Sequence, residues 1–510
     1  MDSNIKESLQ PTAATTLPQL IRSSALAFGD RPAITLTTER GNQSLTFKEL
    51  QSHSEEIARG LVARGIGKGS RVGFIFGNGP MFALLFAAIS RIGAIAVPIS
   101  TFIKAQELVR VIRQSDVIGL IIQSQFLGKN YIARVCEALP ELNSPPSTQL
   151  QMQEVPFLRW VVSDGDQPHA AIHPMSWLLN AAVEINPSLI SAMEQEVHPT
   201  DQLMEIYTSG SMAMPKGVKH CHGPTMARTH YLRSKLSVVP GGSSSLPMPL
   251  FWVGGLMMFL LPNLEMGATT ECTESTATNS RMAMGSVLAK EDLALLPKAN
   301  TIWALGMTET LGPYSYADSL RVEGFPLCPP LDHIAEGFEV RVADSNDNPV
   351  AEGEVGEIQV RGYALTPGLH KMLREDYFTA DGFYHTGDLG QPDGQRVHFV
   401  GRNGDLIKTT NTNVSPAEIE MEMQQLPDIQ SAYVVGIPDR EKGQLVVAAV
   451  VADDGVELNF EVIKAQLSSR LSSFKVPKRY LQITRDDVPM LPSNKVSRRE
   501  IEKMMAERLS

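Results

Sequence analysis

The segment from Tyr207 to Val218 contains residue types that can hold phosphate groups. It reads YTSGSMAMPKGV and follows a short apolar run, so small hydroxyl side chains, glycines and one lysine, Lys216, share a single loop. Such a loop can turn tightly, direct backbone N–H groups at phosphate oxygens and add a positive point charge. Its spacing differs from that of the nucleotide-binding loop GxxxxGK(S/T). Composition alone leaves two interpretations open, a phosphate-binding loop and a plain surface loop.

Further segments with polar or glycine-rich patterns follow in order along the chain. They are GMTET at 306–310, YHTGD at 384–388, GRNGDLIK at 401–408 continued by VSPAEIE at 414–420, and PSNKV at 492–496. Together with residues 207–218 they resemble the signature motifs of the adenylate-forming (AMP-binding) superfamily. That superfamily includes acyl-CoA synthetases, the adenylation domains of peptide synthetases and firefly-type luciferases. The resemblance spans residues 20–505 and is closest to bacterial medium- and long-chain acyl-CoA ligases.

The resemblance implies a set of nucleotide-binding residues. Those expected to contact ATP or AMP are Thr208, Ser209, Gly210, Ser211, Lys216, Gly306, Met307, Thr308, Asp388, Arg402 and Lys495. Within this set the loop residues would surround the phosphates, and Asp388 with Arg402 would bind the ribose, because a carboxylate accepts two hydroxyl protons well. A structural ion pair is the alternative for Asp388 and Arg402.

The same resemblance gives catalytic roles to Lys495, Thr308 and Glu309. A divalent cation that bridges phosphate oxygens needs a carboxylate, so Glu309 is expected to hold Mg²⁺, which neutralises the leaving pyrophosphate. Lys495 would place positive charge near the α-phosphate, where the carboxylate of the acid attacks. By residue type alone, Glu309 is also compatible with a helix-cap feature and Lys495 with an exposed lysine.

The function that the resemblance implies is ATP-dependent activation of a carboxylic acid to an acyl adenylate, followed by thioester formation with coenzyme A. ATP, Mg²⁺ and coenzyme A are the expected cofactors. Arg402, Gly404 and Asp405 would form a hinge for the C-terminal domain between the two half-reactions, since glycine tolerates large changes in φ and ψ. Two alternatives stay open: transfer of the acyl group to an acyl carrier protein, and a catalytically impaired nucleotide-binding homologue.

The acyl pocket is expected near the segment PLFWVGGL, which resembles the aromatic–glycine segment beside the acyl group in the family. Phe251, Trp252, Gly254 and Gly255 are its candidate residues. The apolar side chains favour a fatty or other hydrophobic acid over acetate. Core packing is the alternative for such side chains.

Some positions depart from the family pattern. Met212 and Ala213 stand where the family has a hydroxyl residue and glycine, and Leu305 replaces a frequent tyrosine. Between Gly267 and Gly306 the family normally has an additional strand–helix unit of about 30 residues or more. These departures favour the impaired homologue, whereas the retained candidate catalytic residues favour an active enzyme.

The elements that must position these residues alternate between helices and buried strands. Helices are expected at 47–64, 81–92 and 105–114, and strands at 71–76, 94–98 and 117–123. Such repeats predict an α/β fold in which helices flank parallel sheets. Residues 335–401 predict a β-rich subdomain, and residues 402–510 a small mobile α+β C-terminal domain. The expected domains are therefore a flexible tail at 1–16, an N-terminal adenylation domain at 17–401 and the C-terminal domain.

Composition narrows the possible partners. The formal net charge of −11 argues against a general nucleic-acid binder, which needs a basic surface. The four cysteines are far apart, which favours reduced thiols and a cytoplasmic location. No apolar run reaches the length of a membrane span. The expected partners are a small carboxylic acid, ATP and coenzyme A, and the oligomeric state stays open.

Overall fold

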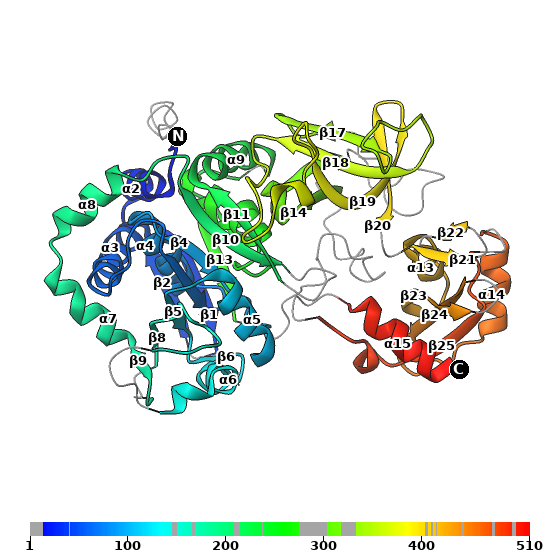
Figure 1. Ribbon diagram of the computed structural model, residues 1–510, viewed down its shortest axis with the longest axis horizontal. Coiled ribbons are helices and arrows are strands. Elements are labelled where there is room, and N and C mark those ends of the chain that lie inside the picture. The colour runs from blue at the N-terminus through cyan, green and yellow to red at the C-terminus, as the bar shows by residue number, and fades with distance from the viewer. Residues whose placement is uncertain are drawn as a thin grey trace. The chain divides into compact units, whose positions relative to one another are not determined.

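The chain folds into two compact units, which Figure 1 shows as a ribbon. The first unit comprises Met1–Asn279, Met307–Gly312 and Ala364–Arg374, and the second Ser280–Gly306, Pro313–Tyr363 and Glu375–Ser510. The structure is a computed structural model. It describes residues 14–39, 41–144, 150–165, 169–208, 215–236, 238–274, 303–317, 333–402, 406–409, 412–414, 416–439, 443–471, 475–491 and 496–509.

A seven-stranded sheet forms the centre of the first unit, in the order β11-β10-β4-β3-β5-β8-β9. All neighbouring strands are parallel except β10 and β11. The strands are β3 (Arg71–Ile75), β4 (Ile95–Pro98), β5 (Gly119–Ile122), β8 (Trp160–Ser163), β9 (Ile172–Pro174), β10 (Gln202–Thr208) and β11 (Lys216–Cys221). Because β4, β5 and β8 are buried along their whole length, the sheet has an apolar interior typical of helix-covered parallel sheets.

Helices alternate along the chain with the first strands of this sheet, as their apolar spacing predicts. They are α3 (Phe47–Ala63), α4 (Pro80–Arg91) and α5 (Ala105–Ser115). Helix α3 begins where it does because Thr46 and Glu49 form a capping box: Glu49 N donates to Thr46 Oγ1 at 3.1 Å and Thr46 N to Glu49 Oε2 at 2.9 Å. Helix α5 ends at Asp116, which adopts a left-handed conformation with φ 55°.

A second sheet of the first unit has four strands in the order β12-β13-β1-β2. Its strands are β1 (Pro32–Thr38), β2 (Gly41–Thr46), β12 (Ser243–Ser245) and β13 (Thr269–Thr273). The other elements of the first unit are α2 (Leu17–Phe28), β6 (Gln125–Phe126), β7 (Lys129–Asn130), α6 (Tyr131–Ala138), α7 (Met175–Ala181), α8 (Pro187–Gln195), α9 (His222–Lys235), α10 (Val253–Gly255), a π-helix at Leu256–Leu260 and α11 (Leu261–Met266).

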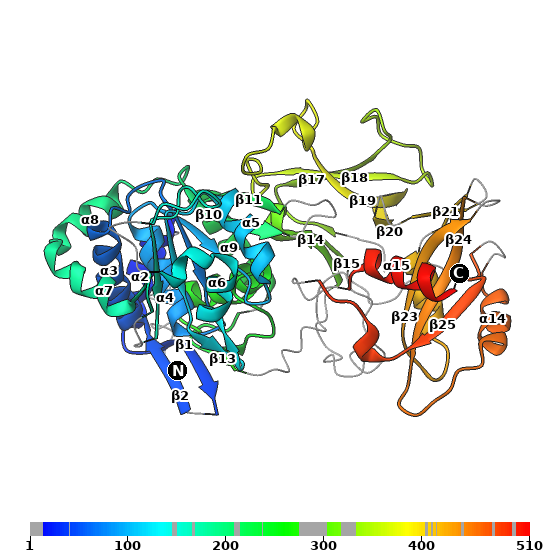
Figure 2. The same cartoon turned by 60° about the horizontal axis from the view of Figure 1, so that its bottom comes forward.

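The second unit contains the predicted β-rich part. Strands β17 (Phe338–Ala343), β18 (Gly356–Gly362), β19 (Tyr384–Asp393) and β20 (Arg396–Arg402) pair antiparallel in sequence order, as Figure 2 shows. A smaller sheet has the order β14-β15-β16, with β14 at Trp303–Met307, β15 at Gly312–Ala317 and β16 at His333–Ile334.

The C-terminal part of the second unit is a five-stranded sheet with helices on both faces. Its elements are β21 (Ile407–Thr409), β22 (Thr412–Val414), α13 (Pro416–Gln424), β23 (Ile429–Asp439), β24 (Gly443–Ala452), α14 (Phe460–Ser468), β25 (Arg479–Ile483) and α15 (Arg498–Leu509). Val434 and Val446 pack with α13 and α14, whereas the adjacent Val435 and Val447 pack with α15. This alternation follows from the two-residue period of a strand.

The predicted fold class is confirmed: the chain is α/β, with a large N-terminal part, a β-rich section and a small α+β C-terminal part. The boundaries predicted at 16 and 401 and the mobility of the C-terminal domain stay predictions. Residues 1–13 of the expected tail lie outside the described residues, and Thr16 is buried before α2. Among the helices that the structure describes, none is long and apolar enough to cross a membrane.

Candidate active site

The two stems of the expected phosphate loop are the strands β10 and β11. These strands pair antiparallel, and Thr208 stands opposite Lys216 at the last pair of the ladder. The loop therefore leaves and re-enters the sheet at the same point. Ser209, Gly210 and Ser211, and with them Met212 and Ala213, lie outside the described residues.

The GMTE motif forms a tight turn at the end of β14. Thr308–Thr310 is a short 3₁₀ helix, in which Thr310 Oγ1 lies 3.2 Å from Met307 N and donates to Gly312 O at 2.7 Å. The chain then reverses through Leu311 and Gly312, both with positive φ (52° and 97°). Glu309 is buried, with 7% of its surface exposed. The turn thus holds Gly306, Met307, Thr308 and Glu309 within one compact segment.

This turn is attached to β11, although the two are far apart in sequence. His220 on β11 places Nε2 2.8 Å from the backbone oxygen of Thr308. Burial lowers the pKa of His220 to about 4, so the ring is neutral at physiological pH and Nε2–H is the donor. Thr366 N donates to Glu309 O at 2.7 Å, and Thr366 Oγ1 to Lys219 O at 2.8 Å. The structure therefore brings Thr308 and Glu309 beside the strand that carries Lys216.

Asp388 and Arg402 meet in the second unit, where they are partners on β19 and β20. Arg402 Nε donates to Asp388 Oδ1 at 2.9 Å, and only 5% of Asp388 is exposed. Asp388 N donates to Thr386 Oγ1 at 3.0 Å, which orients the start of this segment. The ion pair that the sequence left as an alternative is therefore present. It leaves the ribose role of the two residues a prediction.

The candidate acyl segment is packed tightly around its glycines. A Cβ atom on Gly255 would lie 2.2 Å from Pro249 O, and one on Gly254 would lie 2.6 Å from Met248 Sδ. Phe251 is buried, and Trp252 is partly buried. Phe102, which the sequence analysis did not identify, stacks edge-on against Phe251 with ring centroids 5.6 Å apart. Aromatic rings therefore pack together at the candidate acyl segment.

Other expected site residues lie outside the described residues: the hinge residues Gly404 and Asp405, and Lys495. Their neighbours are described. Arg498, at the start of α15, binds Glu420 with two bonds of 2.7 Å. Glu420 is buried and belongs to the motif at 414–420. The motif at 414–420 is thus joined to the start of α15 by a bidentate ion pair, which is a strong and directional contact.

The prediction that Glu309 holds Mg²⁺ can be compared with the metal-ligating side chains that the structure describes. In the described ranges, no group of three or more His, Cys, Asp or Glu side chains could hold a metal ion. A single carboxylate nevertheless fits Mg²⁺ in a phosphate-transfer site, because one or two carboxylates and the substrate phosphates usually hold this ion. Glu309 is compatible with that arrangement.

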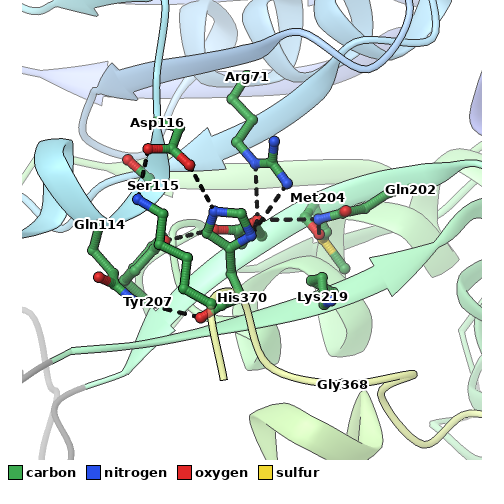
Figure 3. A network of polar contacts seen from close by, with 12 residues as sticks. Arg71, Gln114, Ser115, Asp116, Gln202, Met204, Tyr207, Lys219, Gly368 and His370 are labelled. Atoms are coloured by element: carbon green, nitrogen blue, oxygen red, sulfur yellow. Dashed lines mark hydrogen bonds and ion pairs between the residues drawn. The ribbon is translucent and has the colours of Figure 1, made fainter. Parts of the chain in front are cut away.

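A group of charged residues below the phosphate loop was missed by the sequence analysis. Arg71, Asp116, Glu205 and His370 come from four separate stretches of the chain and meet beside β10 (Figure 3). The only available signal was the acidic Glu205 within an otherwise apolar strand. None of the other residues lies in a motif.

Comparison with known proteins agrees with the fold. The profile of the AMP-binding enzyme family matches residues 21–305, and that of the AMP-binding enzyme C-terminal domain matches residues 418–495. The mitochondrial medium-chain acyl-CoA ligase of Mus musculus is 24% identical over 554 residues, with 97% of this chain and 88% of that protein covered. A fatty acid–acyl-carrier-protein ligase of Streptomyces coeruleorubidus is 26% identical over 514 residues, with 90% and 91% covered.

A solved structure supports the same fold. An anthranilate CoA ligase in complex with anthranoyl-AMP matches with a TM-score of 0.80 at 17% identity, and 98% of each chain is covered. The fold and the ordered motifs therefore define an enzyme of the adenylate-forming class. The chain belongs to the AMP-binding enzyme family, as the sequence motifs indicated.

The buried histidines predict a loss of stability in acid. Burial lowers the pKa values of His220 and His222 from 6.5 to about 4. Between these values the unfolded chain binds more protons than the folded chain, so stability is full above pH 6.5 and falls as the pH approaches 4. In His220→Gln, which keeps a donor but does not titrate, we expect a smaller drop in melting temperature between pH 7 and pH 5.

The control for this experiment is His198→Gln, because 60% of the His198 side chain is exposed. Its melting temperature should fall with pH as much as that of the wild type. Equal drops in both variants would show that His220 does not contribute to the acid sensitivity.

Proposed function

We propose that this protein activates a hydrophobic, fatty-type carboxylic acid with ATP and Mg²⁺, and then joins the acyl group to coenzyme A. The observation that carries the proposal is the attachment of the GMTE turn to the phosphate-loop strand through His220 and Thr366. Two motifs that act on the same phosphates in the family are thus held side by side here.

In the first half-reaction an oxygen of the acid attacks the α-phosphorus of ATP. The bond between that phosphorus and the oxygen bridging to the β-phosphate breaks, and pyrophosphate leaves. Thr208, Thr308 and Lys216 would bind the phosphates, and Lys495 would stabilise the charge that builds at the α-phosphate. Mg²⁺, held by Glu309, would neutralise the leaving group.

In the second half-reaction the thiol of coenzyme A attacks the acyl carbon, and AMP leaves. Asp388 and Arg402 would hold the ribose during both steps. Arg402, Gly404 and Asp405 would form the hinge between them. A cytoplasmic location is part of the proposal.

The choice of a hydrophobic acid rests on the aromatic side chains at the candidate acyl segment. Phe102, Phe251 and Trp252 contact one another, with ring centroids 5.6–6.3 Å apart. Side chains of this kind bind apolar groups and offer no charged partner to a second carboxylate. The related mouse enzyme is named as a medium-chain acyl-CoA ligase, which agrees with this choice.

Two alternatives have specific support. A related Streptomyces protein is named as a fatty acid–acyl-carrier-protein ligase, so a carrier protein is the second candidate acceptor. An impaired homologue is favoured by Met212 and Ala213 and by the short stretch after Gly267, much of which lies outside the described residues. The alignment with the mouse enzyme covers 554 residues against 510 in this chain, so that enzyme has residues without a counterpart here.

The direct test is release of pyrophosphate from ATP and Mg²⁺ across short, medium, long and aromatic acids, with and without coenzyme A. We expect release that depends on medium or long acids and increases with coenzyme A. Release that responds only to an acyl carrier protein would select the alternative acceptor. If no acid elicits release from a chain that still binds ATP, the impaired homologue is correct.

Lys495→Ala is expected to abolish adenylation, with a loss of about 100-fold or more, because the charge at the α-phosphate is removed. ATP binding and the melting temperature should change little. The control is Lys503→Ala, since Lys503 is an exposed lysine on α15. Turnover of Lys495→Ala at the rate of this control would refute the assigned role.

Glu309→Gln is expected to weaken the dependence on Mg²⁺, because the amide keeps the shape but lacks the negative charge. The midpoint of the Mg²⁺ titration of pyrophosphate release should move to higher concentration. Glu336→Gln serves as the control, as Glu336 is exposed. Superimposable titrations of Glu309→Gln and wild type would exclude Glu309 as a metal contact.

A further inference from the structure

A set of polar and charged side chains, most of them partly buried, lies at the base of the phosphate loop. We define the Glu205 cluster as Arg71, Asp116, Glu205, Tyr207 and His370, which are joined by hydrogen bonds and ion pairs. Figure 3 labels all of these residues except Glu205. These residues come from β3, the end of α5, β10 and the segment 364–374. No family motif accounts for Arg71, Asp116, Glu205 or His370.

Glu205 is the centre of this cluster and is fully buried. Its Oε2 accepts hydrogen bonds from Arg71 Nε and from Gln202 Nε2, both at 3.2 Å. Its Oε1 accepts a hydrogen bond from Tyr207 Oη, with 2.5 Å between the two oxygens. Burial, and then the charge of Glu205, raise the pKa of Tyr207 well above its usual value, so Tyr207 remains a donor. The carboxylate therefore orients the residue immediately before Thr208.

The side chain of His370 joins two further members of the cluster, Arg71 and Asp116. Its Nδ1 lies 3.3 Å from Arg71 Nη2, and its Nε2 lies 3.2 Å from Asp116 Oδ2. Because Arg71 can only donate, Nδ1 must accept, and the proton resides on Nε2. Asp116 also accepts from Lys371 Nζ at 2.6 Å. This pattern fixes the tautomer and the orientation of the His370 ring.

Both stems of the phosphate loop are reached from this cluster. His370 N donates to Gly217 O at 2.7 Å, next to Lys216 on β11. Gly217 is also the cross-strand partner of Tyr207. A Cβ atom on Gly217 would lie 2.7 Å from Tyr207 Oη and 2.8 Å from Glu205 Oε1, so only glycine leaves room for this bond. Tyr207 therefore acts on the first stem and His370 on the second.

The buried charge of Glu205 is better explained by a role in orienting its hydrogen-bond donors than by a contribution to the folding stability. A buried ion pair loses the hydration of its charges, and well-packed apolar side chains of similar volume are often as stabilising. An apolar residue at position 205 would match its neighbours Met204 and Ile206, which are both buried. The Glu205 carboxylate orients its hydrogen-bond donors, because hydrogen bonds to a carboxylate restrict the donors to narrow geometries.

We propose that Glu205 and His370 are positioning residues for ATP: through Tyr207 and Gly217 they hold the two stems of the phosphate loop so that Thr208 and Lys216 face the phosphates. This inference rests on the proposed function, because it assumes that the loop binds ATP. It concerns ATP affinity and not the choice of acid.

The test compares Tyr207→Phe with Tyr131→Phe in the full-length protein. Tyr131 is a matched control, since its buried hydroxyl donates to Thr101 O at 2.8 Å in the same unit. We expect the dissociation constant for ATP with Mg²⁺, measured by calorimetry, to rise about tenfold in Tyr207→Phe, as for the loss of one bond to a charged group. The KM for ATP should rise in parallel, the KM for the acid should stay constant, and the two variants should melt alike.

A second pair of variants tests His370. His370→Leu removes both polar contacts of the ring, whereas His370→Gln keeps one acceptor and one donor. ATP affinity should fall about fivefold in His370→Leu and stay within about twofold of wild type in His370→Gln. Combined with Tyr207→Phe, His370→Leu should add less than its separate effect, because both act through one cluster.

The outcomes separate this inference from the proposed function. If the wild-type protein binds ATP but releases no pyrophosphate with any acid, the proposed function is refuted. The ATP affinities of the variants, measured by calorimetry, then still test whether Glu205 and His370 position the phosphate loop. Unchanged ATP affinity in Tyr207→Phe, or an equal loss in Tyr131→Phe, overturns the positioning role. Absence of ATP binding by the wild type overturns both.

Discussion

The antiparallel pairing of β10 with β11 is the interaction on which the candidate active site depends. The sheet is parallel up to β10, and β11 then returns along its edge, so that Thr208 and Lys216 stand opposite each other. Since β11 is the edge strand, its outer side is available to other segments. Leu369 forms a bridge with Val218 there, and His220 reaches the turn that carries Glu309.

The site is held mainly by backbone groups and buried polar side chains. Two backbone oxygens of the GMTE turn, those of Thr308 and Glu309, each have a buried partner in His220 or Thr366. In a low-dielectric interior such bonds are strong, and leaving one unmade is costly. The position of the turn beside β11 is thereby fixed through its backbone.

Most of the secondary structure could be predicted because apolar spacing is a local property. The helix begun at Phe47 and the strand at 71–75 lie close to their expected positions. The motifs also predicted a set of nucleotide-binding residues, and their roles stay predictions. The role of residues 364–374 could not be predicted, since this segment has no periodicity and its contacts with Glu309 and Gly217 join distant parts of the chain.

The sequence by itself determined the family, the α/β class and the residue types available for adenylation, because motifs and periodicity are written along the chain. Only the tertiary structure decided which of these residues become neighbours. It paired Asp388 with Arg402, tied the GMTE turn to β11 and gathered Arg71, Glu205 and His370 at one place. The physical reason is that a buried charge must find its partners in space, and sequence separation does not reveal where those partners lie.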